Sequence, residues 1–530
     1  MKRILFFLIH IILTAALSAQ TIYTVCDPMP KREVRGVWLT TLSGLDWPKE
    51  KATSESGRAK QKAELCKILD QLQECGMNTV FLQTRVRGSV IYPSKIEPWD
   101  VALTGQYDKD PGYDPLAFAI EETHKRGMEL HAWIVTIPSF KIAQAQKMGK
   151  RSLLHTHPTL LRKHQDTYYL DPGLPGVSDY LTSICQEIVE KYDVDGIHLD
   201  YIRYPENAGA FPDGQTYKKY GPQGQARQND KDKKTARQND KDKKTAKQTG
   251  KAAAKSTVPV SPEAKNDWRR NNITAIVRQM NKAIKSRKPW VRFSCSPVGK
   301  FDDVTRFSAK GWAAYSTVFQ DAQGWLREGI MDMLCPMMYF EGDHFYPFAA
   351  DWQENAHGRI IAPGLGIYFL HPKERDWSLG IVQRELNYIR QQGLQGQAYF
   401  RSRFLTDNTK GIYDYLEQTY YPYRALTPAL TWQNSTAPET PKFDKRERKD
   451  GIMERITWKP VEKDGQPCRY VIYASKETQL DISRPENIVC IVREPEYTYN
   501  LLSATLYDLH LAITALDRFG NESAPLEIED

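Results

Sequence analysis

Eight short apolar runs recur from residue 33 onward, and helical patterns lie between them. The runs are residues 33–41, 78–86, 129–136, 195–202, 291–299, 332–340, 359–369 and 396–405. Between the first two, Leu65, Leu69 and Leu72 recur at helical spacing and Gly76 ends the pattern. Continuously apolar strands that alternate with helices predict parallel strands covered on both faces. Eight such units predict a (β/α)₈ TIM barrel, whose active site lies where the strands end.

A doubly wound open sheet is the competing fold, but no glycine-rich phosphate turn follows the first run. The chain has 530 residues, which is long enough for more than one domain. A proline-rich joint at 420–441 is followed by short alternating strands, typical of a small all-β sandwich. These strands are residues 454–460, 469–475, 488–494 and 509–523. We therefore expect a barrel over 31–425 and a sandwich over 441–530.

The first residues have the order of a secretory signal peptide. Lys2 and Arg3 precede an apolar run over residues 4–17, and small residues lead to Ala19. This run is shorter than the roughly 20 residues that span a bilayer. We expect residues 1–19 to be removed and the protein to be exported to the periplasm, the cell envelope or the medium, without an integral membrane span. Export would permit a disulfide between Cys468 and Cys490, which the sequence alone cannot establish.

The formal net charge of +8 is concentrated in one segment. Residues 226–255 hold eleven Lys or Arg and four Asp, and the signal peptide adds two more basic residues, which leaves the rest of the chain near −1. The sequence ARQNDKDKKT stands at 226–235 and again at 236–245. Such a polar repeat without aromatic residues predicts a disordered insert, which we place at 213–262. A nucleic-acid-binding protein should carry its basic charge on the folded surface, so that class is excluded.

Polar and aromatic residues gather at the ends of the apolar runs. They are Trp38, Gln83, Arg85, Trp133, Asp200, Arg203, Tyr339, Glu341, Tyr368 and Arg401. An unpaired charge in a barrel wall is costly, so we expect these groups to face a cleft. The alternative for Asp200 is a buried ion pair with Arg203 or Arg85, and the alternative for Glu341 is an exposed loop position.

Aromatic rings beside carboxylates favour a carbohydrate polymer as the ligand, because a ring stacks on the apolar face of a sugar. Glycoside hydrolysis needs two carboxyl groups, one protonated and one ionised. Asp200 is the first candidate, and Glu341 and Asp171 compete for the second role, with Glu97 behind them; Asp171 could instead cap the following helix. Glu97 and Trp99, in a loop that could cap the barrel mouth, join the remaining run-end residues as candidates for substrate binding.

Two further classes of function remain open. A carbohydrate-binding barrel without hydrolytic activity would carry the same aromatic cleft. A metal-dependent deacetylase would need three ligands on rigid elements. His155 and His157 lie in a polar loop, and His131 has no acidic partner at a fixed spacing, so the sequence predicts neither a metal site nor a cofactor.

Several of these stretches, taken together, resemble the glycosyl-hydrolase-like 10 family. They are EVRGVWLTTLSGLDWP (33–48), EPWD (97–100), HKRGMELHAW (124–133), LDPGLPGVSDYL (170–181), DVDGIHLDYIRYP (193–205) and DWRRNNITAIV (267–277). The resemblance covers residues 31–345 and implies a (β/α)₈ barrel, glycosidase activity on peptidoglycan strands stripped of their stem peptides, and Asp200 as the strand-four acid. The strand-four stretch is also similar to that of chitinases, but Ile202 stands where their catalytic glutamate would be. The last domain resembles a fibronectin type III module.

Overall fold

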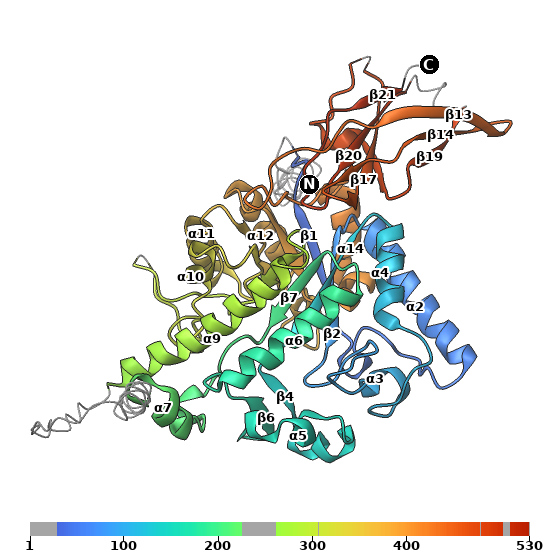
Figure 1. Cartoon of the computed structure of the whole chain (residues 1–530). Helices are drawn as coiled ribbons and strands as arrows, with labels where there is room; N and C mark the ends of the chain where they lie inside the picture. Colours follow the sequence, from blue (N-terminus) through green and yellow to red (C-terminus); the bar gives the residue numbers. More distant parts are fainter. Residues whose placement is uncertain (1–28, 225–260, 306, 478, 502–508, 529–530) are drawn as a thin grey trace, which may run out of the picture.

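The computed structural model describes residues 29–224 and 261–528, apart from 306, 478 and 502–508. The expected signal peptide and the repeat at 226–245 lie outside the described residues. Figure 1 shows two bodies, a larger one of strands surrounded by helices and a smaller one of strands that ends the chain. Both expected parts of the fold, a barrel and an all-β sandwich, are therefore present.

The larger body is a closed parallel barrel. Its strands are β1 (Val34–Leu39), β2 (Thr79–Arg85), β3 (Glu129–Val135), β7 (Gly196–Asp200), β8 (Arg292–Cys295), β9 (Met333–Leu334), β10 (Ile360–Ile361), β11 (Gly364–Leu365) and β12 (Gly396–Tyr399). The sheet runs in the order β10-β9-β8-β7-β3-β2-β1-β12-β11. Its two ends, β10 and β11, are neighbouring pieces of one stretch of chain at residues 360–365. This stretch pairs with β9 through β10 and with β12 through β11, and so it closes the ring of eight predicted strands.

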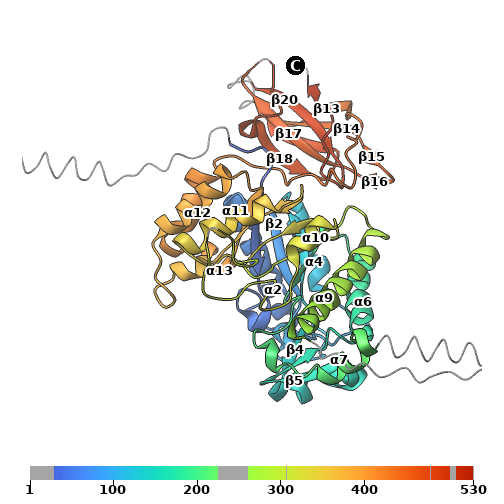
Figure 2. The same cartoon turned by 90° about the vertical axis from the view of Figure 1, so that its left-hand side faces the viewer.

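A helix follows each barrel strand and covers the outer face of the sheet (Figures 1 and 2). The main helices are α2 (Glu55–Glu74), α4 (Pro115–Lys125), α6 (Pro175–Lys191), α9 (Pro262–Lys285), α10 (Ala322–Arg327), α11 (Tyr346–Glu354), α12 (Leu379–Gln391) and α14 (Ile412–Tyr415). Every residue of β1, β2, β3, β7 and β8 is buried. Because both faces are covered, apolar residues occupy both faces of these strands, and this explains why their sequence does not alternate strictly between apolar and polar; the polar residues that they do contain, such as Arg35 and His131, are themselves buried.

Successive side chains of a strand still point to opposite faces, and this alternation fills the barrel interior. Trp38, Phe81 and Trp133 belong to the inner cluster of buried residues. Their neighbours Val37 and Leu82 belong to the larger cluster that packs under the helices. The barrel therefore has a solid, aromatic-rich centre beneath its mouth.

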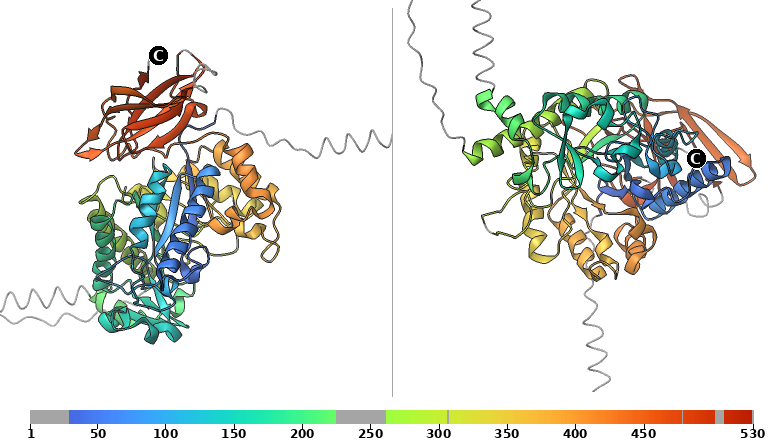
Figure 3. Two further views of the ribbon diagram at one scale, coloured as in Figure 1. Left: turned by 90° about the vertical axis from the view of Figure 1, so that its right-hand side faces the viewer. Right: turned by 90° about the horizontal axis from the view of Figure 1, so that it is seen from below.

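The carboxyl ends of the strands carry additional elements (Figure 3, right). These are β4 (Pro138–Lys141), α5 (Leu153–Thr156), β5 (Leu161–His164), β6 (Thr167–Leu170), α3 (Val101–Thr104), α7 (Gly214–Tyr220) and α13 (Ser402–Thr406). Strands β4, β5 and β6 form a small antiparallel sheet. Asp213 is fully buried and pairs with Arg269 of α9 at 2.8 Å. The expected insert therefore began too early, since residues 213–224 are folded and anchored to the barrel.

The sandwich contains two antiparallel sheets. Its strands are β13 (Lys442–Asp450), β14 (Met453–Lys459), β17 (Arg469–Ser475), β18 (Ile488–Val492), β19 (Glu496–Asn500), β20 (His510–Leu516) and β21 (Leu526–Ile528), with a short β15 (Glu462–Lys463) and β16 (Gln466–Pro467) hairpin. One sheet has the order β13-β14-β19 and the other β18-β17-β20-β21. The sequence did not predict β13, β19 and β21; of these, β13 is largely exposed and charged rather than alternating in polarity. The likeness to fibronectin type III modules stays a prediction.

Charged pairs attach the sandwich to the amino ends of the barrel strands. Asp193, just before β7, accepts hydrogen bonds from Arg518 at 2.5 Å and from Arg493 at 3.2 Å. At the start of β3, Glu129 lies 3.5 Å from Arg469 of the sandwich. The sandwich thus lies at the end of the barrel opposite the strand ends that we expect to carry the active site, as Figure 2 also shows.

No helix among the described residues combines the length and the apolar character that crossing a bilayer requires. The seven cysteines that the structure describes are all free, Cys468 and Cys490 included.

Candidate active site

A cleft of about 820 Å³ opens at the carboxyl ends of the barrel strands. It is lined by Trp38, Thr40, Leu42, Leu45, Gln83, Arg87, Trp133, Val135, Asp200, Tyr201, Ser296, Met337, Tyr339, Phe400 and Arg401. Six of the residues singled out in the sequence are in this list, and they come from six different strands or the loops that follow them. Among the described residues that line this cleft, Asp200 is the only carboxylate.

Asp200 is the last residue of β7. It lies two residues after His198, so both side chains point to the inner face of the barrel, and Asp200 lies at its mouth. Thr136 holds its backbone oxygen through an amide at 2.9 Å and a hydroxyl at 2.8 Å. Tyr201 follows with a φ of 54°, a conformation that is costly for a bulky residue and is found mainly at functional sites. The end of β7 is therefore sharply bent and firmly held.

The carboxyl group of Asp200 accepts three hydrogen bonds. Its Oδ1 receives them from the Tyr201 amide at 2.7 Å and the Ser296 hydroxyl at 3.1 Å, and its Oδ2 receives one from Trp133 Nε1 at 3.2 Å. Asp200 is only 6% exposed. Burial raises its pKa above the ordinary aspartate value, because the charge of Arg203 and these hydrogen bonds offset the loss of hydration only in part. Such a carboxyl group retains its proton to a higher pH than an exposed aspartate.

No described basic side chain forms an ion pair with Asp200, so the structural alternative considered for it does not apply here. Arg85 pairs instead with Glu97, Nη2 to Oε1 at 2.7 Å. The guanidinium of Arg203 lies over the Tyr201 ring, 4.3 Å from its centroid. Asp200 is thus held by neutral hydrogen-bond donors, with one cation nearby that acts at longer range.

A neutral aromatic layer supports the floor of the cleft. Trp38 donates from Nε1 to His198 Nε2 at 3.1 Å, and His198 Nδ1 lies 2.9 Å from the Ser294 hydroxyl. Burial lowers the pKa of His198 well below its ordinary value, which keeps the ring neutral. With its Nε2 accepting from Trp38, the neutral ring carries its proton on Nδ1, toward Ser294. This layer holds Trp38 in place beneath a ligand.

The wall opposite Asp200 is aromatic. Tyr339 stacks on Phe400 with ring centroids 5.5 Å apart and an interplanar angle of 27°. Tyr368 lies outside the cleft lining and packs edge-on against both rings, at 5.8 Å from each. Stacked rings present a flat apolar face of the kind that a sugar ring covers, so Tyr339 and Phe400 form the wall and Tyr368 supports it.

Gln83 and Arg401 shape the loops around the mouth. The side-chain oxygen Oε1 of Gln83 accepts from the Thr40 hydroxyl at 2.6 Å and from the amide of Leu42 at 2.8 Å. Arg401 donates to Asp46 at 2.9 Å. Both residues line the cleft, and both also fix the loop that follows β1. A ligand would therefore be contacted by the groups that these bonds do not use, the side-chain NH₂ of Gln83 and the terminal nitrogens of Arg401.

Three of the residues expected to bind substrate are packed inside the protein. The Arg85 and Glu97 side chains are 0% and 1% exposed, and Tyr180 donates a further hydrogen bond to Glu97. Trp99 is 7% exposed and belongs to the large buried cluster. In this structure the three residues brace the loop beside the barrel mouth and do not line the cleft.

Both candidates for the second carboxyl group lie outside this cleft. Asp171 is fully buried, pairs with Arg162 at 3.2 Å, and accepts hydrogen bonds from Thr216 and from the Gly173 amide. Glu341 is exposed, seven residues after β9 and directly before the short helical turn Gly342–His344. It lies close enough to raise the pKa of Glu385 further, which burial already holds well above the usual value. The assignment of a catalytic role to either residue stays a prediction.

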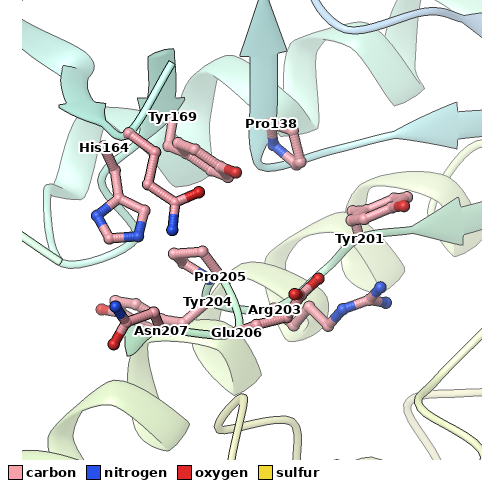
Figure 4. A pocket seen from close by; sticks show the side chains of 10 residues that line it. Pro138, His164, Tyr169, Tyr201, Arg203, Tyr204, Pro205, Glu206 and Asn207 are labelled. Atoms are coloured by element: carbon pink, nitrogen blue, oxygen red, sulfur yellow. The ribbon is translucent and has the colours of Figure 1, made fainter. Parts of the chain in front are cut away.

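A second cleft of about 530 Å³ adjoins the first (Figure 4). Tyr201 lines both clefts, and the second is otherwise formed by the β5–β6 hairpin, Pro138 and the turn after β7. Arg203, expected from the sequence to bind substrate, is found here together with Glu206. Sequence reasoning missed Glu206, although its position six residues after Asp200 in the same loop was a usable signal.

The described residues contain no group of three or more His, Cys, Asp or Glu side chains arranged to hold a metal ion.

Comparison with known proteins identifies the family. The family model described as glycosyl hydrolase-like 10 matches residues 33–360. The glycosyl hydrolase YngK of Bacillus subtilis is 31% identical over 519 residues, which are 93% of this chain and 92% of that protein. The glycosyl hydrolase DigH of Escherichia coli is 35% identical over 58% of this chain and 65% of that protein.

Among solved structures, the glycoside hydrolase domain of PgaB (BpsB) from Bordetella bronchiseptica aligns with 73% of this chain and 98% of its own length, at 11% identity and a TM-score of 0.46. The family match includes Asp200 and ends before Phe400 and Arg401. The chain therefore belongs to the glycosyl hydrolase-like 10 family and is a glycoside hydrolase.

Proposed function

We propose that this protein is exported and cleaves the glycan strands of peptidoglycan from which the stem peptides have been removed, with Asp200 as the catalytic acid. The observation that carries the proposal is a buried carboxyl group with a raised pKa in an aromatic cleft at the barrel mouth. A carboxyl group of this kind suits a general acid, which must still hold its proton at the working pH.

In the proposed reaction, a sugar of the strand lies on the stacked rings of Tyr339 and Phe400. Asp200 donates its proton to the glycosidic oxygen as the bond to the anomeric carbon breaks, and one sugar end leaves as an alcohol. Water then supplies the hydroxyl group to the anomeric carbon, and the proton that the water gives up is taken by a carboxylate, either Asp200 itself or the second group, from which it returns to Asp200 through solvent. The Ser296 hydroxyl and Trp133 Nε1 hold the Asp200 carboxyl group toward the cleft throughout.

A second carboxyl group is needed as nucleophile or base. Glu206 joins Glu341 and Asp171 as a candidate, because it lines the cleft that shares Tyr201 with the Asp200 cleft. Burial raises the pKa of Glu206, and the nearby charge of Arg203 opposes this shift. Single Glu-to-Gln and Asp-to-Asn variants of the three residues, compared for turnover at equal folded concentration, identify the partner of Asp200.

The test of the function uses purified mature protein with intact and with peptide-stripped peptidoglycan, and identifies released fragments by mass spectrometry. We expect sugar fragments from the stripped strands. Binding without release would favour the non-catalytic carbohydrate-binding barrel. Release of acetate alone, lost with a chelator and restored by zinc, would favour a metal-dependent deacetylase. Fractionation of cells that produce the full chain tests export, which rests on residues 1–19.

A further inference from the structure

The second cleft contains a buried cation without a bonding partner. Arg203 is 6% exposed, and its guanidinium forms no hydrogen bond or ion pair with any described residue. Its Nη1 is buried and has no hydrogen-bond partner. The guanidinium carbon Cζ lies 4.3 Å from the centroid of the Tyr201 ring. Arginine stays charged at all physiological pH values, and a buried charge without a hydrogen-bonded partner is destabilising. The site is therefore incomplete without an acceptor.

The backbone around Arg203 is fixed. The Arg203 amide donates to the Tyr201 carbonyl at 2.8 Å, and the amide of Tyr204 donates to the Val318 carbonyl at 3.1 Å. The ring of Tyr204 is completely buried and packs edge-on against Phe319 at 5.7 Å. Figure 4 shows the guanidinium beneath the Tyr201 ring, with the Glu206 side chain beside it.

A second unpartnered nitrogen lies on the other side of the same cleft. His164, the last residue of β5, is 6% exposed, and its Nε2 is buried without a hydrogen-bond partner. Its ring is held edge-on by Tyr169 at 5.9 Å and by Phe211 at 5.7 Å. Two polar nitrogens from separate elements are thus buried at one cleft with their hydrogen bonds unmade, a pattern that calls for explanation because nearly all such groups are paired.

The chemistry of the lining favours an anion at Arg203. Glu206 is the only carboxylate among the described residues that line this cleft, and it is exposed and forms no ion pair with Arg203. The fork of guanidinium N–H groups fits a carboxylate with two parallel hydrogen bonds. Because Tyr201 is common to both clefts, a ligand that extends beyond one sugar at Asp200 reaches this position.

We propose that the second cleft binds a carboxylate carried by a sugar residue beside the scissile bond, and that Arg203 is the group that binds it. The inference rests on the proposed function. In a peptidoglycan strand, removal of a stem peptide leaves a free carboxylate on the lactyl group of the muramyl sugar, whereas an attached peptide turns that carboxylate into a neutral amide. Arg203 would thereby select stripped strands.

The test compares two oligosaccharide preparations from stripped strands, one with free lactyl carboxylates and one with these converted to primary amides. For the wild type we expect kcat/KM to be about 10- to 100-fold higher on the free form, the range expected for a charge-assisted pair. Arg203→Met keeps an unbranched apolar stem beside Tyr201 but removes the guanidinium, and should reduce this ratio to about 1–2, by losing activity on the free form.

Two further variants are the controls. Arg203→Lys keeps the charge without the fork and should retain an intermediate ratio. Lys163→Gln removes a cation from the exposed side of the same β5–β6 hairpin and should leave the wild-type ratio unchanged. Because each ratio compares two substrates in one variant, a general effect of Arg203 on Asp200 cancels. An equal rate of the wild type on both forms, or an unchanged ratio in Arg203→Met, would overturn the proposal.

Calorimetric binding of the same oligosaccharides to the inactive Asp200→Asn variant separates this inference from the proposed function. In one outcome the wild type cleaves neither form, but the free form binds about tenfold more tightly than the amidated form, and this difference disappears when Arg203 is also replaced. The hydrolase proposal then fails and the carboxylate site stands. If stripped strands are cleaved without regard to the carboxylate, the hydrolase proposal stands and the carboxylate site fails. If neither form is bound or cleaved, both fail.

Discussion

Replacing Asp200 with asparagine separates catalysis from structure at the barrel mouth. The amide is nearly isosteric with the carboxyl group, and its oxygen can still accept from the Tyr201 amide and the Ser296 hydroxyl. The NH₂ group then faces Trp133 Nε1, which loses its acceptor at 3.2 Å. The variant can neither donate a proton to a glycosidic oxygen nor carry a negative charge.

The stability change has two opposing parts. The lost hydrogen bond to Trp133 costs about 1–3 kcal/mol. Against this, the pKa of Asp200 is raised in the folded protein, so the folded state binds the proton more tightly than the unfolded chain. The stabilisation that comes with the proton is complete below the unfolded pKa of about 3.9 and is lost as pH rises through the folded pKa. At neutral pH the ionised group is therefore a cost that asparagine removes.

We expect the two parts to nearly cancel, so that Tm at neutral pH changes by less than about 3 °C. Turnover of stripped glycan should fall by about 10²–10⁴-fold or more, the contribution typical of an acid–base group. The assay is thermal unfolding followed by circular dichroism, together with fragment release per folded molecule. A variant that melts far below the wild type yet turns over normally when folded would refute the catalytic assignment, and so would normal turnover at a normal Tm.

Three further predictions concern the surroundings of Asp200. Arg203→Met removes the cation that lowers the pKa of Asp200, so the alkaline limb of the kcat/KM profile should move to higher pH; a limb that moves down or stays fixed contradicts this arrangement. Arg85→Met leaves Glu97 buried without its partner and should destabilise the fold by about 3–5 kcal/mol in denaturant titration, whereas an unchanged midpoint would show that the pair is dispensable. Deletion of 226–255, a segment without an apolar face, should leave Tm within about 2 °C and turnover unchanged; a larger fall in either would assign the segment a structural role.

Several features of the molecule could be predicted from the sequence because they depend on local pattern. Strands covered on both faces are largely apolar, so each of the eight barrel strands was visible as a run of mostly apolar residues. Because the active site of a barrel lies where its strands end, the position of Asp200 at the end of its run predicted its place at the mouth. The edge strand β13, which is largely exposed, carries no such signal and was missed.

Only the tertiary structure determined which charged side chains form ion pairs with one another. Arg85 and Asp200 stand at strand ends in the sequence and Glu97 in a loop, but Arg85 and Glu97 neutralise each other in the interior, while Asp200 is left with neutral donors at the cleft. The unpartnered guanidinium of Arg203 likewise follows from the bent end of β7 and from the β5–β6 hairpin packed beside it. Residues far apart along the chain determine these pairings through distance and burial, and neither quantity is a function of sequence spacing.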